Sequence, residues 1–256
     1  GLTMSLVGMG AFAGPAIGGF LVDSLGWASV LYTTAGLGVV SLIAAVIILD
    51  TPRSGEGDST NESFDWLGAT FSAIILISLL LAITFGSRYG WNSTLVITAF
   101  GIFLASIGLF TWWELSVDSP LLDLKLFGNR LFSTGVLASW LSFLGTQPVR
   151  FLIPFYIQFV LGFNASTMGW IIVPSALSMA IAGPVGGRFS DKYGWGIFNV
   201  GGMIVTAIGL LMLVNLDVEK PLILIIVGMV VQTLGSGSFW PSNNSSILSV
   251  VSPANY

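Results

Sequence analysis

The sequence predicts an all-α fold, a polytopic bundle of about eight transmembrane helices, and three observations support this prediction. Of the 256 residues, 54% are hydrophobic and only 8% are charged, whereas soluble domains carry roughly 25% charged residues. The mean hydropathy is +0.92. The few charges are gathered in short polar segments that separate long apolar runs. A soluble core of stacked helices is the alternative, but it would need a charged exterior that this composition does not supply.

The charge-free runs give the expected helices in order. They cover residues 1–22, 24–49, 66–87, 89–113, 131–149, 168–187, 193–216 and 222–241, and the fifth run reaches 161 if Arg150 is included. Each is close to the 20 or so residues that cross a bilayer core, where every backbone group must be hydrogen-bonded internally. The polar segments between them are rich in turn residues and too short for a soluble domain.

Lysine and arginine residues set the expected orientation, because short inner loops are enriched in positive charge. If the first run crosses outward, the inner loops hold five such residues and the outer loops two: Arg53, Lys125, Arg130, Arg188 and Lys192 inside, Arg88 and Lys220 outside. Residues 121–130 mix apolar and charged positions at helical spacing, so we expect an amphipathic segment on the inner surface. Because the sequence starts at Gly1 without a basic flank, we expect both ends to be cuts in a longer chain.

The residue inventory excludes most other classes. Cysteine and histidine are absent, which removes disulfides, thiolate nucleophiles, imidazole bases and nearly every structural zinc site. The net charge is −4 and no basic patch exists, so a nucleic acid is not an expected partner. We therefore predict no metal, no cofactor and no enzyme activity.

Two glycine-rich motifs resemble each other. The first run contains AGPAIGG, with Gly14, Pro15, Gly18 and Gly19, and the sixth ends in AGPVGGRFSDKYGW. Small residues at four-residue spacing let helices approach closely, and a proline kinks a span. In each copy an aspartate and a Gly-Trp pair follow, and the two copies are expected to end on opposite sides of the membrane. Inverted repeats of this kind are typical of secondary transporters.

These motifs carry a family resemblance over essentially the whole chain. The segment Gly187 to Gly194, GRFSDKYG, resembles the Gly-x-x-x-Asp-Arg/Lys-x-Gly loop of the major facilitator superfamily, although Trp195 follows where basic residues are usual. The Gly-Pro-x-x-Gly-Gly of the first run is similar to the antiporter motif on the fifth helix of that superfamily's drug exporters. PLLDLKLF and PFYIQFVLG also fit the family with 14 helices that exchanges drugs for protons.

The resemblance implies a partial major facilitator fold. Residues 1–49 would end the N-terminal bundle, 50–130 would form a central helix pair with cytoplasmic loops, and 131–256 would belong to the C-terminal bundle. Gly14, Pro15, Gly18 and Gly19 would form a gating kink that limits leak, with plain helix packing as the alternative. The cytoplasmic loop motif would consist of Gly187, Arg188, Asp191, Lys192 and Gly194.

Within that motif, Asp191 would latch the two halves by accepting from a neighbouring helix N-terminus or pairing with Arg188 or Lys192. A polar turn that obeys the positive-inside rule is the alternative.

Arg150 is the charge that lies within a span. We expect Gly145, Pro148 and Pro154 to interrupt its helix, and Arg150 either to line a cavity or to extend to the outer interface. The other candidate cavity residues are polar or aromatic: Gln147, Tyr156, Gln158, Trp140, Phe155 and Gln232. The acidic residues Asp23, Asp65, Glu114, Asp123 and Asp217 fall at span ends, where we expect them to be solvated.

The sequence thus favours a proton-coupled exporter of drugs or small amphipathic molecules that works by alternating access. Its expected partners are the lipid bilayer, a small-molecule substrate and protons, and we expect a monomer in the inner (plasma) membrane. An uptake or metabolite permease of the same fold is the alternative, followed by a non-transporting truncated protein. A membrane enzyme or a channel is disfavoured because neither clustered catalytic groups nor a repeated polar filter is present.

Overall fold

The computed structural model describes residues 2–48, 65–117, 119–214 and 222–250, without the side chains of residues 2–9, 11 and 12. This part of the chain is helical and contains no strand, which confirms the predicted all-α fold. The long helices are α1 (Leu2–Leu25), α2 (Ala28–Ile48), α3 (Trp66–Tyr89), α4 (Thr94–Glu114), α5 (Arg130–Phe155), α6 (Ala165–Tyr193), α7 (Trp195–Val214) and α8 (Leu222–Leu248). A short 3₁₀ helix, η1 (Leu124–Gly128), precedes α5, and a π-helical turn, η2 (Tyr156–Val160), follows it.

The distribution of side chains is that of a protein in lipid. Among the described residues, seven helices are long and apolar enough to cross a membrane, and an apolar stretch of α1 covers Ala13–Leu25. Large apolar side chains face outward, with Phe159 79% and Ile47 76% exposed, while many buried positions are serine, threonine, glycine or alanine. Helices in a bilayer associate through close packing of small residues because lipid already solvates the large ones. The chain is a multi-pass membrane protein.

Several span boundaries differ from the prediction, and the eighth helix, for example, continues to Leu248, seven residues beyond the expected end. The sixth helix continues to Tyr193, six residues beyond the expected end, because its last turns carry polar residues at the end of a span, where water is available. The fifth helix is not interrupted: α5 runs through Pro148, and only after Pro154 does the backbone change to the π-helical turn η2. The expectation of a broken helix at Gly145 and Pro148 is therefore wrong.

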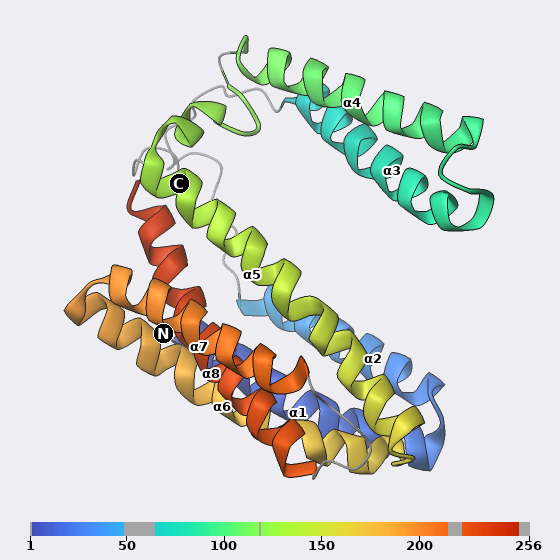
Figure 1. Ribbon diagram of the computed structural model, residues 1–256, viewed down its shortest axis with the longest axis vertical. Helices are drawn as coiled ribbons and strands as arrows, with labels where there is room; N and C mark the ends of the chain where they lie inside the picture. The colour runs from blue at the N-terminus through green and yellow to red at the C-terminus, as the bar shows by residue number, and fades with distance from the viewer. Residues whose placement is uncertain (1, 49–64, 118, 215–221, 251–256) are drawn as a thin grey trace. The chain divides into compact units, whose positions relative to one another are not determined.

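The described residues form two compact units, one within residues 1–49 and 130–256 and the other within residues 50–129. The second unit is the hairpin of α3 and α4 (Figure 1). Small residues line its interface, and Trp91 lies over Gly86 near the turn. The predicted amphipathic segment at 121–130 contains only the short helix η1, which begins after Asp123 caps the amide of Lys125.

The open end of this hairpin buries two acids that we expected to be solvated. Asp65 is 9% exposed and Glu114 is 4% exposed. Asp65 Oδ1 accepts from the Gly68 amide at 2.8 Å and from Trp113 Nε1 at 2.8 Å, and Glu114 Oε2 accepts from the Leu122 amide at 3.0 Å. The pKa of Asp65 is lowered, chiefly by the hydrogen bond from Gly68, while desolvation acts in the opposite direction. These bonds join both helices and the following segment.

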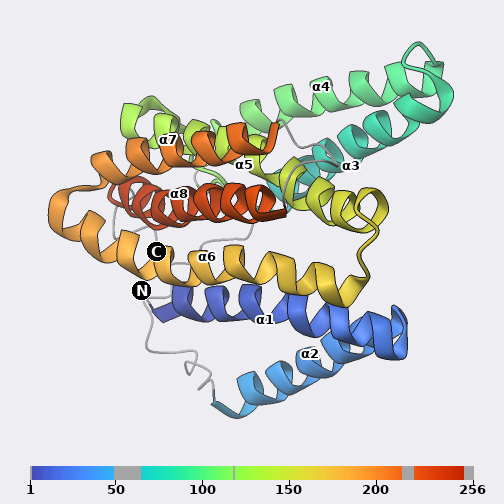
Figure 2. The ribbon, with the colours of Figure 1, turned by 60° about the horizontal axis from the view of Figure 1, so that its bottom comes forward.

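The larger unit is a bundle in which α6 lies between α1 and α8, and α7 lies along α8 (Figure 2). Glycines set the closest approaches. A Cβ atom at Gly237 of α8 would come within 2.9 Å of Ala182 on α6, and one at Gly202 of α7 would come within 2.8 Å of the Gly235 carbonyl on α8. Close packing of small residues therefore brings α6, α7 and α8 together.

The residues in contact also show the directions of the helices. Gly19 and Pro15 of α1 meet Ala165 and Gly169 of α6 in reverse order, so these two helices are antiparallel. Asn243, near the end of α8, donates from Nδ2 to the Gly135 carbonyl near the start of α5 at 2.9 Å. Helices α5 and α8 therefore also run in opposite directions. Arg53, Asp217 and Lys220, which entered the sequence predictions, lie outside the described residues.

Candidate functional site

A cavity of about 470 Å³ lies within the larger unit, between α1, α5, α6 and α8. Its volume falls in the usual range for small-molecule sites. Most lining residues on α1, α6 and α8, among them Pro15, Ser175 and Gln232, fall in the middle third of their helices or close to it, whereas Met168 lies in the first turn of α6. The cavity is thus about halfway across the membrane-spanning bundle, the depth at which secondary transporters hold their substrates.

The helix that carries Arg150 continues from α5 into η2 without a break, which fixes how far Arg150 lies from the helix end. The helical run extends ten residues beyond Arg150, to Val160, which corresponds to about 15 Å at 1.5 Å per residue. Pro154 has no amide hydrogen to donate to the carbonyl of Arg150, so the regular α-helical pattern is lost there and a π-helical turn follows. Arg150 therefore lies about two to three turns from the end of this helical run. Its side chain is exposed and lines the cavity.

Arg150 is the charged residue among the described residues that line this cavity. No aspartate or glutamate lines it in the described ranges, and Arg150 forms no ion pair or hydrogen bond there. A guanidinium group that faces a cavity in a membrane-spanning bundle is costly unless water or a partner compensates its charge. The described lining of the cavity thus carries one positive charge and no negative charge.

Neutral polar groups of α6 and α8 complete the lining. Gln232 is 6% exposed, its Oε1 accepts from Thr233 Oγ1 at 3.3 Å, and its Nε2 lies 3.5 Å from Ser236 Oγ. Gly209 of α7 packs directly against the backbone of Gln232, so a larger side chain at Gly209 would not fit there. Ser175 also lines the cavity and donates from Oγ to the Ile172 carbonyl at 2.7 Å.

Three methionines provide much of the apolar wall: Met168, Met179 and Met229. Methionine is unbranched and polarisable, so it adapts to ligands of different shape. The sequence predictions did not include them. The spacing of Met168, Ile172, Ser175 and Met179 places them on one helix face and was the available signal, but it does not tell whether that face meets a cavity, lipid or another helix.

The other predicted cavity residues lie elsewhere. Trp140, Gln147 and Phe155 are exposed on α5 and do not line the cavity. Tyr156 packs against a cluster of buried apolar residues that includes Ile157, and Gln158 Nε2 donates to Met168 Sδ at 3.2 Å. Of the seven predicted cavity residues, the structure brings only Arg150 and Gln232 together.

The Gly-Pro motif on α1 has two faces. Pro15 and Gly19 touch α6, where a Cβ atom at Gly19 would collide with the Ala165 carbonyl oxygen and lie 3.0 Å from the Ala165 carbonyl carbon. Gly14 lines the cavity, and a Cβ atom at Gly14 or Gly18 would meet nothing within 4 Å. The same motif therefore packs closely against α6 through Pro15 and Gly19 and leaves open space beside Gly14 and Gly18.

A hydrogen bond joins α1 and α6 just beyond this packing. Asp23 Oδ2 accepts from the backbone amide of Ser166 at 2.7 Å. The amides of a first helical turn lack partners within their helix and carry partial positive charge, so a carboxylate there is stabilising. Asp23 was expected to be merely solvated. It occupies the place in its motif that Asp191 occupies in the other copy.

The predicted cytoplasmic loop motif is the end of α6 rather than a loop. Gly187, Arg188, Asp191 and Lys192 are all within the helix, and Gly194 ends it with φ +89° and an amide that donates to the Ser190 carbonyl at 2.9 Å. Asp191 is exposed, and within the described ranges it pairs with neither Arg188 nor Lys192. Lys192 instead lies over the Tyr193 ring, 5.1 Å from its centroid.

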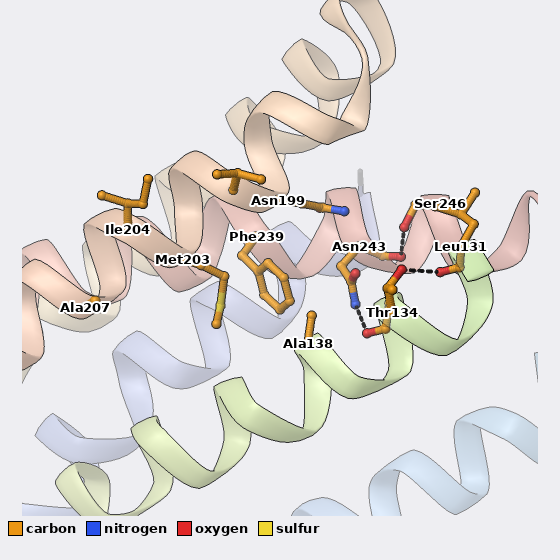
Figure 3. A pocket seen from close by; sticks show the side chains of 12 residues that line it. Leu131, Thr134, Ala138, Asn199, Met203, Ile204, Ala207, Phe239, Asn243 and Ser246 are labelled. Carbon is orange, nitrogen blue, oxygen red and sulfur yellow. Dashed lines mark hydrogen bonds between the residues drawn. The ribbon is translucent and has the colours of Figure 1, made fainter. Parts of the chain in front are cut away.

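A second cavity of about 490 Å³ lies between α5, α7 and α8 (Figure 3). Asn243 is buried there and donates from Nδ2 to the Gly135 carbonyl and to Ser139 Oγ, at 2.9 and 2.7 Å. The lining is otherwise mainly apolar, with Phe239 between Asn243 and Met203. This cavity lies towards the start of α5 and carries no charged group among its described lining residues.

Comparison with known proteins places this chain in a family. The model of the Major Facilitator Superfamily matches residues 1–256. The riboflavin transporter RibZ of Clostridioides difficile is 31% identical over 253 residues, which are 99% of this chain and 54% of RibZ. The multidrug transporter protein MdtP of Bacillus subtilis is 31% identical over 242 residues, 94% of this chain and 44% of MdtP.

The lincomycin resistance protein LmrB of Listeria innocua is 25% identical over 231 residues, which are 89% of this chain and 48% of LmrB. The chain thus spans about half the length of the curated relatives that it matches. RibZ and MdtP are both named as transporters. A match over the whole chain, on a helical bundle with a cavity at mid-membrane depth, shows that this chain belongs to the major facilitator superfamily.

Proposed function

We propose that this chain is part of a secondary transporter that exports drugs or small amphipathic molecules in exchange for protons. The observation that carries the proposal is the cavity, which is walled on one side by the Gly-Pro motif of α1 and on the other by α5, α6 and α8. The resemblance of this motif to that of drug exporters supports export, as do the multidrug and lincomycin-resistance relatives.

Alternating access would use the contact between α1 and α6. In this proposal residues 1–49 end the N-terminal bundle, 131–256 belong to the C-terminal bundle, and 50–130 form the central pair. The Asp23–Ser166 hydrogen bond and the Gly19 contact then close the outer side of the cavity. These contacts would have to separate for the cavity to open outward. Asp191, at the opposite end of α6, would make the corresponding inner latch in the other state.

Proton coupling requires an acid that exchanges protons in step with substrate. The described lining of the cavity contains no carboxylate, so the proposed coupling acid would come from outside this lining. A monomer in the plasma membrane is the form in which we expect the transporter to act.

The test is a transport assay in inverted membrane vesicles that contain the protein. An imposed proton gradient should drive a fluorescent drug into the vesicle lumen, and a protonophore should abolish this accumulation. Drug movement that is independent of the gradient would contradict proton coupling.

Uptake of a metabolite is the second candidate, favoured by the name of RibZ as a riboflavin transporter. Whole cells distinguish the two directions, because an exporter lowers the cell content of its substrate and an uptake permease raises it. Measurement of labelled riboflavin and of a drug in the same cells, with vector-only cells as the control, would decide between them.

A further inference from the structure

We propose that the cavity selects amphipathic substrates that carry an anionic group, and that Arg150 holds this group. The inference rests on the proposed transport function and names its substrate class. It follows from the charge and position of the lining side chains.

The charge of the described lining is one-sided. Arg150 supplies a guanidinium group, and no described acid faces it across the cavity. A cationic drug would meet this group as a like charge in a medium of low dielectric constant, where repulsion is strong. A carboxylate would instead form charge-assisted, bidentate hydrogen bonds with the fork of guanidinium donors.

Because of the position of Arg150 along its helix, a bound substrate is a better partner for its charge than water at the membrane interface. Ten helical residues separate it from the end of η2, about 15 Å along the axis. Long side chains at helix ends reach the interface easily, but a residue two to three turns from the end of its helix does so less readily. A substrate anion that enters the cavity removes the cost of the unpaired charge only while it is bound.

Neutral donors and adaptable apolar groups fit the rest of such a molecule. The amide of Gln232 is held by Thr233 and offers hydrogen bonds near the same cavity. Met168, Met179 and Met229 offer a polarisable surface for a planar apolar body. The site therefore combines one strong anion contact with a permissive wall, which suits a broad set of organic anions.

Two dyes with the same ring system test the charge preference. Fluorescein carries negative charge on a xanthene ring, and a rhodamine methyl ester carries positive charge on the same ring. Binding of each dye to the purified protein in detergent is measured by fluorescence anisotropy. We expect the wild-type protein to bind fluorescein at least about tenfold more tightly, and Arg150→Gln to lose about tenfold in affinity for fluorescein.

Controls separate this effect from unfolding. Arg150→Lys keeps the charge without the guanidinium fork and should retain an intermediate affinity. Arg88→Gln removes a charge at the end of α3, outside the cavity, and should leave binding unchanged. The melting temperature of each variant, followed by tryptophan fluorescence, shows that the protein remains folded.

A second readout uses the absence of cysteine from the sequence. Ser175→Cys places the sole thiol in the cavity lining, so its reaction with a maleimide reports access to the cavity. Fluorescein should slow this reaction, and the protection should disappear when Arg150→Gln is added. The rhodamine ester at the same concentration should protect much less.

Two results would overturn the inference: equal or tighter binding of the cationic dye, or an unchanged affinity of Arg150→Gln for fluorescein. Neither result would contradict the proposed function, because proton-driven export of other compounds is measured separately in vesicles. Conversely, Arg150-dependent fluorescein binding without gradient-driven transport would support the anion site and contradict the proposed function.

Discussion

Substitution of Gly19 by alanine tests whether close packing of α1 on α6 holds the two helices together. A Cβ atom there would meet the Ala165 carbonyl oxygen and carbon, the latter at 3.0 Å, and Ser166 Cα at 3.1 Å. All three are backbone atoms, so no side chain can rotate away and the helices must separate by several tenths of an ångström. Forced overpacking of this kind costs about 1–3 kcal/mol.

Gly18 is the matched control in the same motif, because a Cβ atom there would meet nothing within 4 Å. In both variants alanine favours the helix over glycine by about 1 kcal/mol. This common contribution cancels when the two variants are compared, so their difference of about 1–3 kcal/mol in stability reports the steric cost alone.

The assay is thermal unfolding of the detergent-solubilised protein, followed by tryptophan fluorescence. We expect the melting temperature of Gly18→Ala to equal or exceed that of the wild type, and that of Gly19→Ala to be lower. Equal melting temperatures for the two variants would refute the reasoning, because they would show that α1 does not pack against α6 through Gly19.

Three further predictions concern polar contacts and helix ends. Asp23→Ala leaves the Ser166 amide without its acceptor and should weaken the α1–α6 contact by about 1 kcal/mol. A thiol introduced in the cavity should then react with a maleimide about fivefold faster. An unchanged rate would show that this hydrogen bond is not a latch. The native pKa of Asp65 is lowered, so the charged carboxylate stabilises the hairpin at any pH above the pKa of the unfolded state. This stabilisation is lost as the pH falls through the native pKa. Asp65→Asn should therefore have a lower melting temperature than the wild type at neutral pH and the same melting temperature in acid. Gly194→Ala places alanine at φ +89° and should destabilise the protein by about 1 kcal/mol in denaturant titration, whereas Gly196→Ala, in α7 with open space around it, should not.

The outcome at α5 shows where sequence rules give the wrong answer. Proline removes a hydrogen-bond donor, so Pro148 and Pro154 predicted a broken helix. In a bilayer the alternative, unpaired backbone in hydrocarbon, costs more, and the helix instead continues with a π-helical turn after Pro154. The same reason explains why the helix continues past Arg150 and does not end beside it.

The buried acids illustrate a second limit. Asp65 and Glu114 follow or precede apolar runs and look like ordinary solvated ends in the sequence. The structure brings them to the same end of one hairpin, where backbone amides and the Trp113 indole satisfy part of their hydrogen bonding. The Asp65–Gly68 bond is an N-cap that a local pattern can indicate. Trp113 and Leu122 are 48 and 8 residues from their acids, and no local pattern indicates these partners.

The sequence by itself determined that this chain crosses a membrane as helices, because composition and run length depend only on how each residue partitions between water and lipid. It also determined the family, since the glycine and aspartate motifs are local strings. Only the tertiary structure decided that Gly19 packs while Gly18 is open, and that Arg150 and Gln232 share a cavity that Trp140 and Phe155 do not reach. Helical periodicity places these residues on their helices, but which face meets a neighbour depends on contacts between helices far apart in the chain.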